Sequence, residues 1–220
     1  MPKVIVLDKL SPDGLALLEA TSGIDFEERT GLAGDDLREA LRNADAAICR
    51  SGVKITADVL EGNQRLRAIA RAGVGTDNIE KSAATRLGIV VMNTPTGNTI
   101  STAEHAFALM LALSRNLSPA HAAFKEGKFK EARKKFVGAQ LADKTLGVIG
   151  LGRIGQEVAK RARSFQMRVI GFDPFLSSER ARELGIELLP SVKEMLPQVD
   201  YLTVHTPLTP ETENLIDHDA

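Results

Sequence analysis

The stretch that decides the fold is Leu146-Gly147-Val148-Ile149-Gly150-Leu151-Gly152-Arg153-Ile154-Gly155. Its apolar first part predicts a buried strand, and the glycine-rich turn after it opens a helical pattern that continues to Ser164. The glycines follow the spacing G-x-G-x-x-G, which is a weak signal when it stands alone. An acidic residue, Asp173, ends the next predicted strand, 18 residues after the last of these glycines. A strand, a glycine turn, a helix and a distant acid together predict a dinucleotide site.

Each part of this motif has a physical role. Gly150 permits the tight turn, Gly152 lets the backbone approach a pyrophosphate, and Gly155 lets the helix pack close to the strand. The free N–H groups and the dipole at the start of the helix attract the phosphates. Asp173 would accept hydrogen bonds from the ribose hydroxyls and repel a 2′-phosphate, which favours NAD over NADP. The alternative is a packing motif with a solvent-exposed aspartate.

Strand-like and helix-like segments alternate outward from this stretch, which predicts βαβ units and parallel sheets. The expected strands are Val4–Leu7, Asp25–Arg29, Ala46–Arg50, Arg67–Arg71, Ile89–Asn93, Leu146–Ile149, Arg168–Phe172, Ile186–Leu188 and Tyr201–Val204. The expected helices are Ser11–Ala20, Asp35–Arg42, Ala57–Leu60, Asn78–Leu87, Ser101–Arg115, Ile154–Ser164, Ser178–Leu184 and Val192–Leu196, with another helical stretch after Ser118. We expect an α/β protein with two Rossmann-like doubly wound parallel-sheet domains.

The turn formers of residues 93–98 indicate a domain boundary near residues 94–100. The predicted domains are 1–97 and 98–220. The second has about four expected strands, where a nucleotide-binding sheet of this type usually has about six. We therefore expect this second sheet to be incomplete at the C-terminus, where 215–220 resembles the start of a helix with Asp217 as its N-cap.

Composition narrows the class of protein. The chain has 220 residues, 43% of them hydrophobic and 26% charged, with a formal net charge of −1. The hydrophobic fraction is therefore enough to form a core. The net charge near zero means that the chain lacks the positive electrostatic field that attracts nucleic acid or an anionic membrane. Its one cysteine, Cys49, cannot form an internal disulfide, and no Cys/His cluster has the spacing of a zinc site. Without a signal peptide or a spanning segment, the sequence predicts a cytoplasmic protein that binds neither metal, nucleic acid nor membrane.

The carboxyl ends of parallel strands are where ligands bind in open sheets. Thr206 and Pro207 follow the strand Tyr201–Val204, so a hydroxyl donor and a wall for adenine or ribose are expected there, with a polar strand end as the alternative. In the first domain, Arg50-Ser51-Gly52 and Arg71-Ala72-Gly73-Val74-Gly75-Thr76 end two strands. Guanidinium groups bind phosphate or carboxylate bidentately, and the glycines allow backbone N–H groups to cup an anion. The alternative is an arginine in a surface ion pair.

Two further segments have open interpretations. The long helix Ser101–Arg115 is apolar over more than one face, so it is either a subunit interface or a helix between two domains. Lys125–Lys135 holds six basic and two acidic residues and is either a solvated face or an anion-facing loop. The four histidines, His105, His121, His205 and His218, provide no assigned proton-transfer residue.

Taken together, these segments resemble the D-isomer-specific 2-hydroxyacid dehydrogenases over the whole chain. The resemblance rests on Arg50-Ser51, residues 71–79, residues 93–98, residues 134–138, the 150–155 turn, residues 171–174 and residues 203–208. Arg50-Ser51 and Asn98 are the features of those members that act on D-3-phosphoglycerate. The implied reaction is NAD-dependent oxidation of this phosphorylated 2-hydroxy acid to 3-phosphohydroxypyruvate, the first step of serine synthesis.

The resemblance also implies roles for residues. The implied substrate-binding residues are Arg50, Ser51, Val74, Gly75 and Asn98. The implied NAD-binding residues are Val74, Gly150, Gly152, Arg153, Ile154, Gly155, Asp173, Thr206, Pro207 and Thr212. The first domain would then be part of the substrate-binding domain and the second the NAD-binding domain. Homodimers would form through the cofactor domain and its long helix, with the basic loop near Arg133–Lys135 reaching the neighbour's substrate phosphate.

The family's catalytic Arg, Glu and His would lie beyond the position matching Ala220, so no catalytic residue is expected within this chain. We expect a longer parent enzyme to be active and the chain alone to show little turnover. Two alternatives remain open. One is a glyoxylate or hydroxypyruvate reductase of the same family, and the other is a non-enzymatic protein that responds to NAD.

Overall fold

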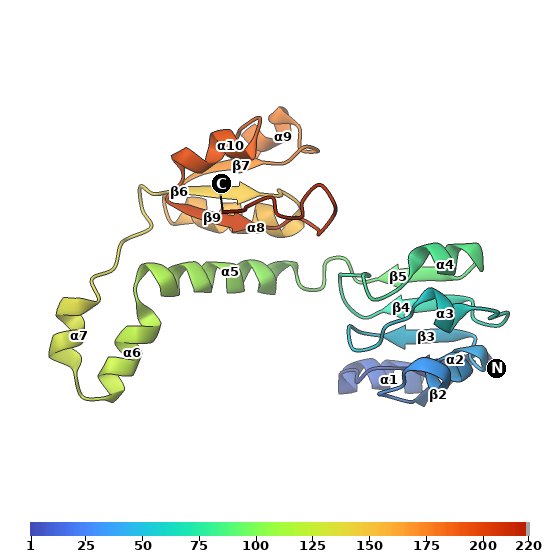
Figure 1. The fold of residues 1–220 in the computed structure, drawn as a ribbon. Coiled ribbons are helices and arrows are strands. Elements are labelled where there is room, and N and C mark those ends of the chain that lie inside the picture. Colours follow the sequence, from blue (N-terminus) through green and yellow to red (C-terminus); the bar gives the residue numbers. More distant parts are fainter. Residues whose placement is uncertain (219–220) are drawn as a thin grey trace. The chain divides into compact units, whose positions relative to one another are not determined.

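The computed structural model describes residues 1–218 and divides into two compact units, Met1–Asn98 and Thr99–Ala220 (Figure 1). The last two residues of the predicted second domain lie outside the described part. Each unit is built around one parallel sheet with helical connections, so the predicted α/β class with two Rossmann-like sheets is confirmed. No helix in the described part of the chain is long and apolar enough to span a membrane.

The first unit contains a five-stranded parallel sheet in the order β2-β1-β3-β4-β5. Its strands are β1 (Lys3–Val6), β2 (Asp25–Glu28), β3 (Ala46–Cys49), β4 (Ala68–Arg71) and β5 (Val90–Asn93). The strand order reverses between β1 and β3, and such a switch point opens a crevice at the carboxyl ends of the strands.

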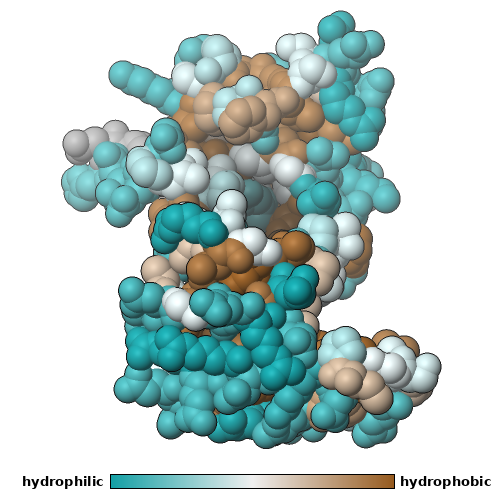
Figure 2. All heavy atoms as spheres, turned by 90° about the vertical axis from the view of Figure 1, so that its right-hand side faces the viewer, coloured by the Kyte–Doolittle hydropathy of each residue, from teal (hydrophilic) through white to brown (hydrophobic). Residues whose placement is uncertain are grey.

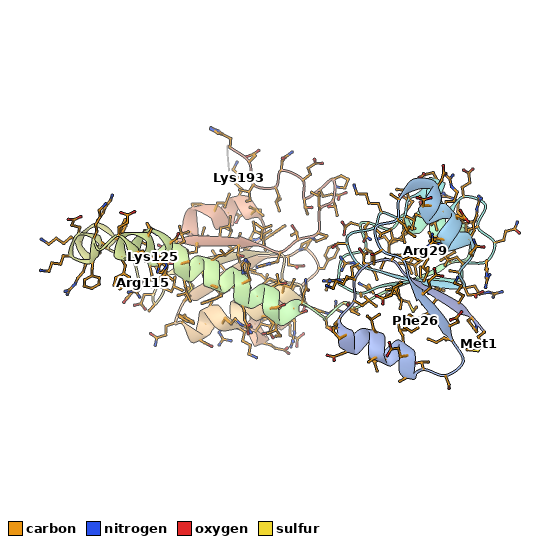
Figure 3. All side chains as sticks on the ribbon, turned by 90° about the horizontal axis from the view of Figure 1, so that it is seen from below. Met1, Phe26, Arg29, Arg115, Lys125 and Lys193 are labelled. Atoms are coloured by element: carbon orange, nitrogen blue, oxygen red, sulfur yellow. The ribbon has the colours of Figure 1, made fainter. Side chains whose placement is uncertain are left out.

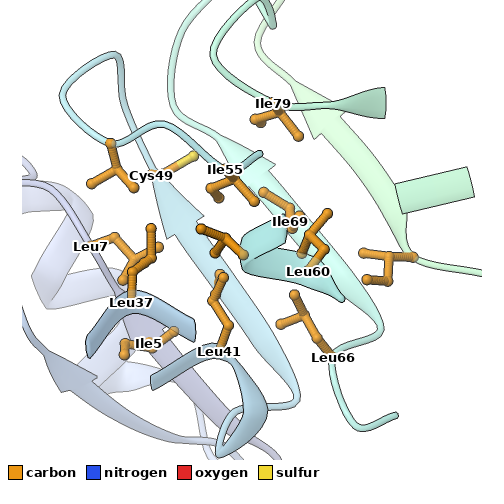
Figure 4. Packing of buried hydrophobic residues seen from close by; sticks show 14 of the residues in the cluster. Ile5, Leu7, Leu37, Leu41, Cys49, Ile55, Leu60, Leu66, Ile69 and Ile79 are labelled. Carbon is orange, nitrogen blue, oxygen red and sulfur yellow. The ribbon is translucent and has the colours of Figure 1, made fainter. Parts of the chain in front are cut away.

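Four helices connect these strands: α1 (Pro12–Ala20), α2 (Gly34–Arg42), α3 (Ala57–Leu60) and α4 (Lys81–Arg86). Ser11 caps α1 as predicted, because its hydroxyl accepts the Gly14 N–H at 3.2 Å. The core lies between the sheet and α2, α3 and α4 (Figure 4), and its members include Ile5, Leu7, Leu37, Leu41, Cys49, Ile55, Leu60, Leu66, Ile69 and Ile79.

The two faces of this sheet are covered unequally. Ile5 and Val6 on β1 are both buried, but burial alternates along β3, where Ala47 and Cys49 are buried and Ile48 is half-buried. The side chains that alternate inward are those that face α2 to α4. Hydrophilic residues predominate in the lower part of the face that Figure 2 shows.

The second unit has a four-stranded parallel sheet in the order β8-β7-β6-β9. The strands are β6 (Thr145–Ile149), β7 (Arg168–Phe172), β8 (Glu187–Leu188) and β9 (Tyr201–Val204). The helices around them are α5 (Thr99–Ser114), α8 (Arg153–Ser164), α9 (Ser178–Glu183), α10 (Val192–Met195) and the short 3-10 turn η1 (Leu196–Gln198). Side chains of α5 and α8 pack on one cluster of strand residues, and those of α10 pack on a second cluster.

The helix α5 buries Ala103 and Phe107 beside α8 and leaves Leu109 and Leu113 58% and 73% exposed. Beyond it lie α6 (Leu117–Lys125) and α7 (Phe129–Lys135). Figure 3 labels Arg115, just after α5, and Lys125, which ends α6.

The structure also decides details that the sequence left open or placed differently. Most of Lys125–Lys135 is helical, and every residue of α7 except Ala132 is exposed, which agrees with the solvated-face interpretation. The last turn of α7 carries Arg133 and two lysines, where positive charge favours the helix dipole. The predicted helix Asn78–Leu87 is shorter and begins at Lys81, because the Asn78 side chain binds backbone carbonyls instead. Residues 210–216 form turns, and the helix expected to begin after Asp217 lies almost entirely outside the described residues.

Candidate functional site

The turn between β6 and α8 requires glycine at two positions. Gly150 has a φ of +85°, and a Cβ there would lie 2.9 Å from the carbonyl of His205. A Cβ at Gly155 would lie 2.1 Å from the Gly150 carbonyl oxygen, so α8 can approach the turn this closely only without a side chain. Around the Cβ position of Gly152, by contrast, no atom lies within 4 Å. The backbone at Gly152, directly before α8, is therefore open to a ligand.

Asp173 connects the end of β7 to this turn. Its Oδ2 accepts the Leu151 N–H at 2.7 Å, and its Oδ1 accepts the N–H groups of Phe175 and Leu176 at 2.8 and 3.1 Å. A carboxylate offers about four acceptor sites. Three are used by the backbone, so about one remains for a hydroxyl group of a ligand.

A cavity of about 880 Å³ lies at the carboxyl ends of β6, β7 and β9. Of the predicted cofactor residues, it is lined by Gly150, Gly152, Asp173, Thr206, Pro207 and Thr212. Arg153, Ile154 and Gly155 are not among its lining residues: Arg153 is exposed in the first turn of α8, Ile154 is half-buried and Gly155 is buried. Val74 lies in the first unit.

Two side chains shape the far wall of this cavity. The His205 Nε2 lies 2.9 Å from the Thr203 hydroxyl, and burial lowers the pKa of His205, which keeps the ring neutral at pH 7. The Thr212 hydroxyl donates to the Pro207 carbonyl at 2.6 Å and accepts the Thr209 N–H at 2.8 Å. Thr212 therefore fixes the loop that closes this side of the cavity.

These features fit a dinucleotide. The open backbone at Gly152 and the start of α8 suit a diphosphate, since helix N-termini attract anions. The neighbouring carboxylate of Asp173 suits a ribose, and the cavity is large enough for a nucleoside.

A second cavity, of about 330 Å³, lies in the first unit at the carboxyl ends of β3, β4 and β5. Its lining residues are Arg50, Ser51, Arg71, Ala72, Gly73, Val74, Thr94, Gly97 and Asn98. Four of the five predicted substrate residues are therefore together, whereas Gly75 is not among the lining residues. The lining contains two arginines and no acidic residue, so it suits an anion.

Three residues that the sequence did not single out hold this cavity in shape. Asp8 accepts the Arg50 N–H at 2.6 Å, and the Asn78 side chain donates to the carbonyls of Arg50 and Val53, both at 2.8 Å. Asn93 donates to the Val74 carbonyl at 2.7 Å. Asp8 and Asn93 lie at or just after the carboxyl ends of strands, which is the signal by which they could have been found.

The described residues contain no group of three His, Cys, Asp or Glu side chains that could hold a metal ion.

Comparison with known proteins agrees with this geometry. Residues 107–220 match the family model "D-isomer specific 2-hydroxyacid dehydrogenase, NAD binding domain". The chain is 46% identical over 216 residues to the D-3-phosphoglycerate dehydrogenase of Methanocaldococcus jannaschii, a match that covers 98% of this chain and 40% of the relative. It is 43% identical over 218 residues to the human enzyme of the same name, covering 99% of this chain and 40% of that protein.

Solved structures resemble the fold over nearly the whole chain. The NAD⁺-bound 3-phosphoglycerate dehydrogenase of Entamoeba histolytica is 28% identical with a TM-score of 0.75, over 96% of this chain and 64% of that one. The apo D-lactate dehydrogenase of Escherichia coli is 28% identical with a TM-score of 0.79, over 97% and 68%. The chain spans about 40% of the length of the curated relatives it matches. With a glycine turn, an acid after β7 and a family model that matches more than half of its residues, the chain belongs to the D-isomer specific 2-hydroxyacid dehydrogenases, a family of NAD-dependent oxidoreductases.

Proposed function

We propose that this chain supplies the NAD site and part of the substrate site of an enzyme that oxidises D-3-phosphoglycerate to 3-phosphohydroxypyruvate, the first step of serine synthesis. The observation that carries this proposal is the cavity of the first unit, which is lined by Arg50, Ser51 and Arg71 and by no acidic residue. Curated relatives at 42–46% identity that are named D-3-phosphoglycerate dehydrogenase support it.

NAD⁺ supplies the hydride acceptor when it is bound. In the proposed site, the backbone at Gly152 and the start of α8 hold the diphosphate, and Asp173 accepts a hydrogen bond from the adenosine ribose. Thr206 and Pro207 form the wall beside the nucleoside. Further contacts are proposed for the remaining cofactor residues, Val74, Gly150, Arg153, Ile154, Gly155 and Thr212, with Val74 near the nicotinamide.

The substrate is held by its two anionic ends. Arg50 and Ser51 bind the phosphate, and the backbone of Val74 and Gly75 cups the carboxylate, with Asn98 beside it. Fixing both ends orients C2, from which the hydride leaves, and such positioning lowers the barrier without new chemistry. The proton of the C2 hydroxyl passes to a base that we do not assign to any histidine of this chain, so we propose that the chain alone has little turnover.

The test is to replace Arg50 by alanine in the longer enzyme and to measure the reaction rate from the formation of NADH. Loss of a hydrogen-bonded charge is expected to raise the KM for D-3-phosphoglycerate by about 10- to 100-fold, while the NADH dissociation constant stays unchanged. Arg67→Ala is the matched control, because Arg67 is an exposed arginine just before β4. An unchanged KM would instead favour a glyoxylate or hydroxypyruvate reductase. Binding of NADH without turnover of any hydroxy acid would favour an NAD-responsive binding protein.

We also propose a homodimer formed through α5. Leu109 and Leu113 are 58% and 73% exposed on this helix, and exposed leucines that lie together on one face suit a protein interface. Leu113→Glu is expected to lower the mass measured by light scattering to that of a monomer. Leu17→Glu, at a 70% exposed leucine of α1, should leave the mass unchanged. A monomeric wild-type protein would contradict this proposal.

A further inference from the structure

Arg71 is the last residue of β4 and lies beside the end of β3. The register pairs it with Cys49, the last residue of β3. Arg50 follows Cys49 directly, so both arginines lie at the carboxyl edge of the sheet. Both arginines line the cavity of the first unit. Two positive side chains are thus brought to one small cavity by strand pairing.

Within residues 1–218, the Arg71 guanidinium has no hydrogen-bond or ion-pair partner. Its Nε is buried and has no hydrogen-bond partner, and no acidic side chain in residues 1–218 forms an ion pair with it. The nearby carboxylate of Asp8 instead accepts the backbone N–H of Arg50. A buried donor without an acceptor is costly, and guanidinium groups normally satisfy their donors. The free donors are therefore available to a ligand.

The backbone is shaped around this side chain. A Cβ at Gly73 would lie 1.5 Å from Nη1 and 2.6 Å from Cζ of Arg71, so the guanidinium occupies the space that any other residue at position 73 would fill. The Gly73 carbonyl accepts the Thr94 N–H at 3.0 Å, which ties this turn to the end of β5. Gly73 thus leaves room for the Arg71 guanidinium beside this turn, and both residues line the cavity.

We propose that Arg71 is a specificity-determining residue that binds the phosphate of the substrate together with Arg50. This inference rests on the proposed function, which assigned only Arg50 and Ser51 to that group. A phosphate dianion has three free oxygens, so it can accept the Nη donors of Arg71, which lines the cavity, and still meet Arg50. A carboxylate carries one charge and two oxygens, which the backbone N–H groups of Val74 and Gly75 can bind.

Inorganic phosphate tests the subsite without turnover. Calorimetry on the full chain should show a dissociation constant for phosphate about 10- to 100-fold higher in Arg71→Ala. Arg71→Lys keeps the positive charge but removes the planar guanidinium with its parallel N–H donors, so it should weaken phosphate binding by a smaller factor. Arg67→Ala, at the residue just before the same strand, should bind as the wild type does. Thermal unfolding of each variant separates lost binding from lost folding, and unchanged phosphate affinity in a folded Arg71→Ala would overturn the proposal.

The longer enzyme tests specificity. Arg71→Ala should lower kcat/KM for D-3-phosphoglycerate by about 10- to 100-fold and leave that for D-glycerate, which lacks the phosphate, unchanged. An equal loss on both substrates would assign Arg71 to the shared carboxylate and overturn the inference. If wild-type enzyme fails to oxidise D-3-phosphoglycerate while Arg71→Ala still abolishes phosphate binding, the proposed function is wrong and the phosphate subsite stands.

Discussion

At the scale of single residues, two glycines of one turn are needed for different reasons. A Cβ at Gly155 would meet the Gly150 carbonyl oxygen at 2.1 Å, whereas a Cβ at Gly152 would meet nothing within 4 Å. Gly155→Ala should therefore destabilise the second unit by about 1–3 kcal/mol through overpacking. Gly152→Ala should cost about 1 kcal/mol or less in stability but weaken NADH binding, because its methyl group fills the space proposed for the diphosphate. Urea denaturation and NADH titration of both variants separate the two effects. Equal losses of stability would contradict this interpretation.

Asp173 has both a structural and a proposed binding role. Loss of one charged hydrogen bond to the ribose costs about 1.5–3 kcal/mol of binding free energy. Asp173→Ala should therefore weaken NADH binding and reduce the preference for NADH over NADPH. The same change removes the acceptor of three backbone N–H groups, so the melting temperature should also fall. Asp173→Asn keeps one oxygen for the backbone and should melt closer to the wild type. An unchanged preference between NADH and NADPH would count against Asp173 as the ribose acceptor.

The spacing of residues predicted part of these sites and missed the rest for a physical reason. The glycine turn and Asp173 are local in sequence, so a motif contains them. The sequence also indicated Arg71 as a possible anion-binding residue, but only the structure shows that its Nε lacks a hydrogen-bond partner. The role of Asp8 depends on a hydrogen bond to a residue 42 positions away. Such long-range pairings are absent from any local pattern.

At the scale of elements, both sheets align their strands in the same way. Asp45 precedes β3, accepts the Lys3 N–H at 2.7 Å and donates its own N–H to the Lys3 carbonyl at 2.8 Å. Asp200 precedes β9 and does the same with Thr145, at 2.8 and 3.0 Å. Each aspartate thus fixes its strand against the start of the neighbouring one. The candidate sites lie at the opposite, carboxyl ends of these strands. The pairing at the strand starts therefore keeps the carboxyl ends side by side.

The pairing at Asp45 makes the first unit sensitive to acid. Hydrogen bonds from the Arg65 guanidinium and then from the Lys3 backbone lower the pKa of Asp45 from 3.8 to about 2. A lowered pKa contributes stability that is present above the unfolded value of 3.8 and is lost as the pH falls toward 2. Asp45→Asn should therefore melt below the wild type at pH 7, and the difference should shrink between pH 4 and pH 2. Asp25→Asn, at an exposed position on β2, should match the wild type throughout. A difference independent of pH would contradict the assignment.

Most strands were predicted to within one residue, because apolar runs bounded by turns indicate them directly. β7 and β9 have the predicted bounds. The helix α4 was predicted too long, since Asn78 uses its amide on the carbonyls of Arg50 and Val53. The helix α7 was not predicted as an element, because Lys125–Lys135 was interpreted only from its charge, as a solvated face or an anion-facing loop. Periodicity detects burial, so it loses accuracy where an element is exposed or ends on a distant contact.

At the scale of the whole molecule, each unit has its own hydrophobic core and its own natural probe. The chain contains one cysteine, one tyrosine and no tryptophan. Cys49 lies in the core of the first unit, where burial and then Asp8 raise the pKa of its thiol to about 11, so the folded protein keeps it protonated and unreactive. Tyr201 lies in the second unit, and its phenol oxygen accepts the Ser114 hydroxyl at 2.9 Å. Thiol labelling therefore reports on the first unit and tyrosine fluorescence on the second.

These probes test whether the cofactor stabilises one unit or the whole chain. A ligand at about 100 times its dissociation constant stabilises the state that binds it by about 2.7 kcal/mol. With a urea dependence of about 1–3 kcal/mol per molar, NAD⁺ should raise the midpoint followed by Tyr201 fluorescence by about 1–3 M. The midpoint followed by Cys49 labelling should move much less, because the cavity and Asp173 belong to the second unit and Val74 is the one proposed cofactor contact in the first. Gly152→Ala should abolish the shift of the Tyr201 midpoint. Equal shifts at both probes would mean that the two units unfold together. No shift at either probe would contradict the proposal that the second unit binds NAD.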